Sequence, residues 1–232
     1  LSRSTGARVV GRRAADVHRG GTVTIVVRLT DVTKRHHRGR EVVTAVDHVS
    51  LELPSGSMIA LAGPSGSGKT TLLNLIVGGD VPDEGAIDGP AGLADWSSLA
   101  IVPQALGLLP ELTIGENIGF PLRLGARVAT DPSEVMDRLG IGAVANRPPE
   151  ETSLGEQQRA AVARALVTSP MLLVADEPTS HQDEANTDRV TAALADIAAA
   201  GSCVFVATHD NRVLNRCDLV LQMRDGVVAN RR

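Results

Sequence analysis

The chain has 232 residues, of which 43% are hydrophobic and 22% are charged, and its 23 basic and 27 acidic side chains give a formal net charge of -4. This balance is typical of a soluble globular protein, and the lack of a basic surplus argues against a dedicated nucleic-acid-binding protein. Aromatic residues make up 1% of the chain and tyrosine is absent, which excludes both a platform of stacked rings for single-stranded nucleic acid and an aromatic ligand cage.

The cysteines and the longest uncharged stretches indicate in which cellular environment the chain is expected. Cys203 and Cys217 lack any CxxC pairing, so we expect reduced thiols in an intracellular protein rather than a disulfide framework or a zinc site. The uncharged stretches 53–68 and 96–110 contain Gly, Pro and Ser, and both are shorter than the roughly 18 apolar residues of a membrane span. We therefore expect a chain that does not cross a membrane by itself.

The first 20 residues differ in composition from the rest. Residues 1–20 carry five arginines and one acid, without apolar periodicity or the continuous apolar core of a secretory signal. We interpret them as a disordered basic tail, with a transit peptide or a membrane-surface contact as alternatives.

From residue 23 onward, β-rich and helical segments alternate. Strands are predicted at 23–32, 42–53, 58–62, 99–102, 171–175 and 203–207, with a final pair around 225–226. Helices are predicted at 69–77, 154–168 and 184–200, with another beginning at Asp131, and residues 85–96 are predicted as turns. This alternation predicts an α/β fold with a largely parallel sheet covered on both faces, and the scarcity of rings predicts a core of Ala, Val, Leu and Ile.

A glycine-rich segment between a predicted strand and a predicted helix matches the phosphate-binding pattern G-x-x-x-x-G-K-[ST]. Its residues are Gly63, Pro64, Ser65, Gly66, Ser67, Gly68, Lys69 and Thr70. The glycines let successive backbone N–H groups point inward, and together with the helix N-terminus these groups form a concavity for phosphate. We predict that Lys69 reaches the β- and γ-phosphates, that Thr70 ligates Mg²⁺, and that Thr71 adds to the nucleotide site. A chance match to a turn is the alternative, at odds on the order of 1%.

Two acidic residues follow directly after the apolar run 172–175. Asp176 is suited to hold Mg²⁺ beside the phosphate loop, and Glu177 is suited to accept a proton from the attacking water. The alternative is that both acids only interact favourably with the dipole of a following helix. The upstream phosphate loop disfavours this alternative.

The chain resembles the ATP-binding subunits of ABC transporters over roughly residues 23–230, because five motifs occur in the order that is usual in that family. They are the phosphate loop 63–70, V-P-Q ending at Gln104, S-L-G-E-Q-Q-R from Ser153, A-D-E-P-T over 175–179 and T-H-D from Thr208. The segments 72–76, 109–113 and 175–179 look most like the branch that serves lipoprotein release, macrolide export and cell division. The family implies a P-loop ATPase core with a small antiparallel β part and an inserted helical subdomain.

The resemblance assigns further roles to single residues. It implies that Gln104 contacts Mg²⁺ and water, and that His209 contacts the γ-phosphate and joins Glu177, Lys69 and Gln104 in catalysis. The alternatives are that Gln104 only caps a strand and that His209 is a structural histidine with its hydrogen bonds made within the fold. It also implies that the ATP bound by a second copy is contacted by four residues of this chain, Ser153, Gly155, Glu156 and Asp183. Ser153 and Glu156 also form a capping box, so an ordinary helix cap is the alternative.

The chain departs from the family pattern at three places. Leu154 stands at the first glycine of the signature motif, and Gln182 stands where the family usually has leucine. The family usually stacks adenine on an aromatic ring in a loop between the first two strands, here residues 34–38. Since tyrosine is absent, we expect the His36 imidazole to stack on the adenine less extensively, which would make the site less selective for adenine. The alternative is that residues 34–38 form only a solvated basic loop.

The resemblance therefore predicts an ATPase that uses ATP and Mg²⁺ and is peripheral to the cytoplasmic face of a membrane. Its expected partners are an integral membrane permease and a second copy, or a related ATPase subunit, and nucleic acid is not expected. The predicted parts are a core over 21–104 and 160–232 and a helical subdomain over 105–159. A nucleotide-gated module that signals through a membrane protein to cell-wall enzymes is the alternative. An ABC-type ATPase acting on DNA or ribosomes is disfavoured by the lack of a second P-loop.

Overall fold

The computed structural model describes residues 24–39, 41–89, 98–126 and 130–230. The predicted tail over 1–20 lies outside these ranges. The strands are β1 (Ile25–Arg38), β2 (Glu41–Pro54), β3 (Ser57–Ala62), β4 (Glu84–Asp88), β5 (Leu99–Val102), β6 (Leu172–Asp176), β7 (Cys203–Ala207), β8 (Leu219–Arg224) and β9 (Val227–Asn230). The helices are α2 (Lys69–Ile76), α3 (Ile114–Arg123), α4 (Pro132–Arg138), α5 (Leu154–Leu166), α6 (Glu184–Ala199) and α7 (Asn211–Leu214), with short 3-10 turns at Gly142–Val144 and Pro149–Glu151.

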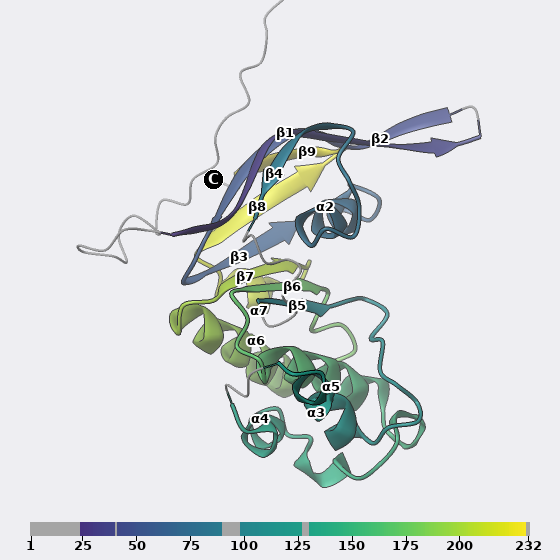
Figure 1. The fold of residues 1–232 in the computed structure, drawn as a ribbon, viewed down its shortest axis with the longest axis vertical. Coiled ribbons are helices and arrows are strands. Elements are labelled where there is room, and N and C mark those ends of the chain that lie inside the picture. The colour runs from purple at the N-terminus through teal and green to yellow at the C-terminus, as the bar shows by residue number, and fades with distance from the viewer. Residues whose placement is uncertain (1–23, 40, 90–97, 127–129, 231–232) are drawn as a thin grey trace, which may run out of the picture.

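A six-stranded sheet of order β5-β6-β7-β3-β8-β9 forms the centre of the molecule (Figure 1). Its strands are parallel except for β9, which runs antiparallel to β8. Every residue of β3, β6 and β7 is buried, as expected for parallel strands with both faces covered. The predicted α/β fold with a largely parallel sheet is confirmed.

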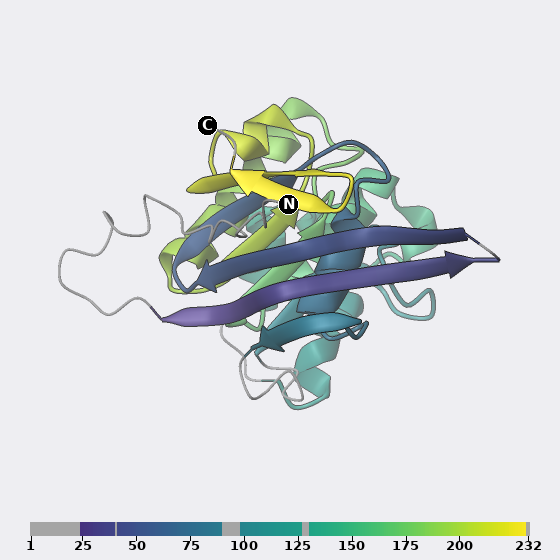
Figure 2. The ribbon, with the colours of Figure 1, turned by 90° about the horizontal axis from the view of Figure 1, so that it is seen from above.

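A second, antiparallel sheet of order β2-β1-β4 covers one face of the central sheet together with α2. Figure 2 shows the long β1–β2 hairpin lying across this side of the molecule. Apolar side chains of β1, β2 and α2 pack there against one face of the central strands. The small antiparallel part that the sequence led us to expect is therefore present.

Two local predictions for this antiparallel sheet are wrong. Residues 84–88, predicted partly as turns, form β4, which pairs with β1 at Thr30↔Ala86 and Thr33↔Glu84. Residues 34–38, predicted as a loop, continue β1, where His36 pairs with Val43. Neither segment contributes a fully buried apolar side chain among the described residues, so backbone pairing with a neighbouring strand makes them strands, and hydrophobic alternation gives no sign of it.

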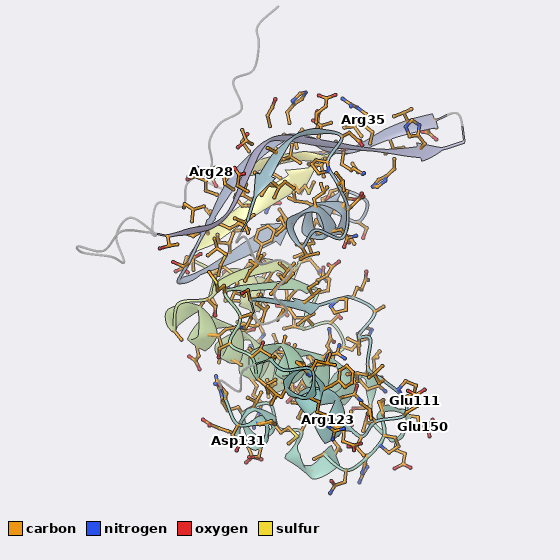
Figure 3. The ribbon with its side chains drawn as sticks, viewed as in Figure 1. Arg28, Arg35, Glu111, Arg123, Asp131 and Glu150 are labelled. Atoms are coloured by element: carbon orange, nitrogen blue, oxygen red, sulfur yellow. The ribbon has the colours of Figure 1, made fainter. Side chains whose placement is uncertain are left out.

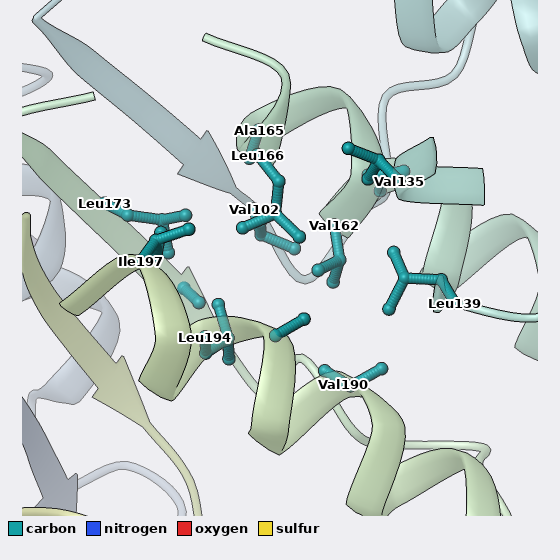
Figure 4. Close-up of a cluster of buried hydrophobic side chains, with 14 of the residues drawn as sticks. Val102, Val135, Leu139, Val162, Ala165, Leu166, Leu173, Val190, Leu194 and Ile197 are labelled. Carbon is teal, nitrogen blue, oxygen red and sulfur yellow. The ribbon is translucent and has the colours of Figure 1, made fainter. Parts of the chain in front are cut away.

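The opposite face of the central sheet is covered by α3, α4, α5 and α6, whose apolar side chains form one cluster (Figure 4). Val162 of α5 and Val190 and Leu194 of α6 are fully buried in it. As predicted, the core consists mainly of Ala, Val, Leu and Ile, and Phe205 is the one fully buried aromatic side chain among the described residues.

The helix starts follow the capping signals in the sequence. Asp131 caps α4, with Pro132 in its first turn, and α5 begins with a complete capping box of Ser153 and Glu156. These caps satisfy N–H groups that have no partner within the helix.

Charged side chains lie at both ends of the molecule. Figure 3 shows Arg28 and Arg35 on the antiparallel sheet, at the opposite end from Arg123 and Asp131 in the helical part. Arg28 pairs with Glu52 at 3.0 Å. None of the helices in the described part of the chain has both the length and the apolar character that a membrane span requires.

The two cysteines carry free thiols. Burial raises the pKa of the Cys203 thiol to about 12, and burial also raises the pKa of the Cys217 thiol to about 12. Neither sulfur is therefore an effective nucleophile near neutral pH.

Candidate nucleotide site

The phosphate loop connects β3 to α2, as the sequence predicts. Gly66 and Gly68 have φ values of 78° and 104°, which side-chain-bearing residues rarely adopt. A Cβ on Gly68 would collide with the Ala45 carbonyl, and one on Gly63 with the Met223 carbonyl. No described side chain caps the N-terminus of α2, so its backbone donors remain available to an anion.

Lys69, the first residue of α2, folds back over the loop. Its Nζ donates to the Gly63 carbonyl at 2.8 Å and to the Pro64 carbonyl at 3.0 Å. The ammonium group thus lies at the phosphate loop, where it can meet the charge of a bound polyphosphate.

Thr70 and Asp176 meet where α2 approaches the end of β6. The Thr70 hydroxyl donates to Asp176 Oδ2 at 2.9 Å. Burial raises the pKa of the Asp176 carboxyl, and Glu177 adds to this, while the Thr70 hydrogen bond and Lys69 oppose it. A buried carboxylate of this kind is stabilised by a cation.

The donors at this position fit Mg²⁺. A carboxylate and a hydroxyl are hard oxygen ligands, which Mg²⁺ prefers. Among the described residues, no group of three or more His, Cys, Asp or Glu side chains is arranged to hold a metal ion. Phosphate oxygens and water would supply further ligands, as is usual for Mg²⁺ at nucleotide sites.

Glu177 follows Asp176 and has a φ of 51°, a conformation that costs a non-glycine residue energy and is concentrated at functional sites. Its side chain accepts from the Thr208 hydroxyl at 3.2 Å and pairs with His209 Nδ1 at 2.8 Å. The hydrogen bond to Glu177 raises the pKa of His209, and the negative charges of Glu177 and Asp210 add to this. The carboxylate is thus held by two partners.

A cavity of about 590 Å³ joins these groups. The predicted site residues that line it are His36, Ser65, Gly66, Gly68, Lys69, Thr70, Thr71, Gln104, Asp176 and Glu177. Gln104 is exposed two residues after β5, and His36 Nε2 lies 3.3 Å from the Thr71 hydroxyl. Gly63, Pro64 and Ser67 belong to the same loop without lining the cavity, and His209 is joined to it through Glu177.

Four further predicted residues neither line this cavity nor belong to the phosphate loop: Ser153, Gly155, Glu156 and Asp183. The first three form the start of α5, and Asp183 caps α6 through the Asn186 N–H. Leu154, beside Ser153, is 48% exposed.

Some residues at the cavity have no role in the sequence prediction. Asp225 and Gly226 line it, and the Gly226 N–H donates to the Ser67 carbonyl at 3.1 Å. Their turn is recognisable in the sequence, but its position beside the phosphate loop follows from the parallel pairing of β8 with β3. Thr208 lies within a motif, although the sequence does not indicate that it holds Glu177.

The parallel sheet, the glycine loop before α2 and the paired acids at the end of β6 define the P-loop class of nucleoside triphosphatases. A model of the ABC transporter family matches residues 46–180. The dimeric structure of the ATP-binding cassette MJ0796 in a post-hydrolysis state, bound to ADP and Pi, is similar with 30% identity and a TM-score of 0.78, over 89% of this chain and 99% of that one. A second dimeric structure of MJ0796, described as an ABC transporter cassette, has 30% identity and a TM-score of 0.76 over the same shares.

The chain belongs to the ABC transporter family, and it is an ATPase domain of that family.

Proposed function

We propose that the chain is the ATP-binding and ATP-hydrolysing subunit of a transporter and powers a separate membrane permease by closing and reopening a dimer. The observation that carries the proposal is the cavity at which the phosphate loop, the Thr70–Asp176 pair and Glu177 meet. Thr70 and Asp176 would hold Mg²⁺, which when bound offsets negative charge on the phosphates.

The other side chains account for hydrolysis. Glu177 orients a water and accepts its proton while the water oxygen bonds to the γ-phosphorus. The bond from the γ-phosphorus to the bridging oxygen breaks, which leaves ADP and phosphate. Lys69 and His209 stabilise the charge of the transferred group, and Gln104 would contact the water and help to hold Mg²⁺.

Two copies account for the residues outside the cavity. The α5 N-terminus, with Ser153, Gly155 and Glu156, is free to face the γ-phosphate of a second copy, and Asp183 lies in the neighbouring loop. The dimeric structures of MJ0796 support a dimer of this chain. The half-exposed Leu154 would lie at this interface in place of glycine.

We propose that His36 takes the place of an aromatic ring beside the base. It is half-buried on β1 at the wall of the cavity, and an imidazole presents a smaller face than the ring of tyrosine. We expect His36→Ala to weaken ATP binding by about fivefold, the loss of a modest stacking contact, and we expect the unchanged chain to bind ATP and GTP with comparable affinity. Titration of both nucleotides measures this, and an unchanged ATP affinity in the variant would disprove the stacking role.

We propose a core over 21–104 and 160–232 and a helical subdomain over 105–159, with α5 shared between them because it runs across residue 159. The partner is an integral membrane permease bound near Gln104, so the chain lies peripherally on the cytoplasmic face of a membrane. The segments 72–76, 109–113 and 175–179 favour the branch of lipoprotein release, macrolide export and cell division. The signalling module uses the same site, and no observation on the described residues favours it.

The partner decides between these functions. Cross-linking in native membranes, followed by purification of the tagged chain and mass spectrometry, should recover an integral membrane protein. Recovery of nucleic acid without a membrane protein would refute the transporter. If the co-purified permease and the chain are placed in vesicles, ATP-dependent substrate movement supports transport, whereas activation of a cell-wall enzyme without movement supports the signalling alternative.

A further inference from the structure

Gln182 joins the start of α5 to the loop that precedes α6. Its Nε2 donates to the Gly155 carbonyl at 2.8 Å. Its Oε1 accepts from an Arg159 Nη1 at 2.6 Å. One amide therefore connects the loop to two successive turns of α5.

Arg159 makes this amide hard to replace. The residue is 7% exposed, and burial lowers the pKa of its guanidinium, although Glu156 and Asp183 partly offset this through their charges. Its Nε has no hydrogen-bond partner in the described part of the chain. Loss of the Gln182 oxygen would leave a second donor group of a buried cation unpaired, which is costly.

The same helix also holds the beginning of this loop. Gln158 Nε2 donates to the Glu177 carbonyl at 2.6 Å and to the Ser180 hydroxyl at 2.9 Å. A Cβ on Gly155 would stand 3.0 Å from the His181 carbonyl, so helix and loop are in close contact. Consequently α5 is bonded to both ends of the segment from Glu177 to Gln182.

We propose that Gln182 is a positioning residue that fixes the first turn of α5 and the Asp183 loop relative to each other before a second copy binds. The inference rests on the proposed function, in which these two segments meet the ATP of the second copy. Segments that are already ordered lose less conformational entropy on association. Leucine, which the resemblance to the family leads us to expect at this position, can neither donate nor accept a hydrogen bond and so could not make this link.

The test measures dimerisation in a chain that also carries Glu177→Gln, so that ATP is not consumed. With ATP and Mg²⁺ present, Gln182→Leu should raise the dimer dissociation constant about tenfold, as expected for the loss of hydrogen bonds that include one to a charged group. ATP affinity of the monomer should stay unchanged, because Gln182 does not line the cavity. Analytical ultracentrifugation and nucleotide titration give the two quantities.

Gln182→Glu separates positioning from stability. Glutamate keeps an acceptor for Arg159 and should restore the melting temperature that Gln182→Leu lowers, but it cannot donate to the Gly155 carbonyl. We expect its dimer to be as weak as that of Gln182→Leu, at low and at high salt. Recovery of dimer affinity together with stability would assign Gln182 a purely structural role, and recovery at high salt alone would trace the defect to the added charge. Either outcome would overturn the proposal.

The outcomes also distinguish this inference from the proposed function. If the Glu177→Gln chain stays monomeric with ATP and Mg²⁺, the dimer mechanism fails and this inference falls with it. If that chain dimerises and Gln182→Leu does so with equal affinity, the proposed function stands and only the role of Gln182 is refuted.

Discussion

Replacement of Lys69 by alanine should abolish measurable nucleotide binding. The Lys69 ammonium lies on the Gly63 and Pro64 carbonyls of the phosphate loop, and a charge-assisted contact to phosphate is among the strongest hydrogen bonds in proteins. We expect ATP affinity to fall by about hundredfold or more, as measured by calorimetric titration.

The chain offers a matched control for this change. Its only other lysine is Lys34, whose Nζ pairs with Asp80 at 2.8 Å and does not line the cavity. Lys34→Ala should bind ATP as the unchanged chain does. Equal ATP affinity in the Lys69 variant and the Lys34 variant would overturn the assignment of the phosphate site.

Glu177→Gln should stop hydrolysis and accumulate an ATP-bound dimer. Glutamine matches glutamate in size and its carbonyl oxygen can still accept from Thr208 or His209, but it cannot take a proton from water. Loss of a general base costs roughly 10²–10⁴ in rate. Release of phosphate and the mass of the complex in solution, each measured with ATP and Mg²⁺, report the two effects.

Glu134→Gln is the control for this second change, because Glu134 is an exposed acid in the first turn of α4. It should hydrolyse ATP at the unchanged rate and form no lasting dimer. A Glu177 variant that hydrolyses ATP as fast as this control would remove Glu177 from the role of base.

The phosphate site could be predicted from sequence because it is built from short continuous segments. The loop 63–68 and the acids at the end of β6 each carry their own local signal, and parallel strands bring them to one edge of the sheet. Gln182 also stands out in the sequence at its position. Its link to Arg159 could not be predicted, because that hydrogen bond depends on how α5 packs beside the loop.

The errors in the antiparallel sheet have the opposite origin. The segment 84–88 has one half-buried apolar side chain, Ile87, and becomes a strand through pairing with β1. His36 was expected in a loop, but the ladder of β1 with β2 continues past it to Arg38. In both cases backbone pairing with another strand decides the structure, with the adjacent strand for His36 and with a distant one for 84–88, so local hydrophobic pattern carries no information about it.

The raised pKa values of the two thiols have a practical consequence for following the conformational changes of this molecule. With a pKa of about 12, each thiol is ionised in only about one molecule in 10⁵ near neutral pH. A cysteine introduced at an exposed position would react with a maleimide dye while the native pair stays silent. Fluorescence energy transfer between two labelled copies could then follow closure and reopening in real time, with Cys203 and Cys217 left in place.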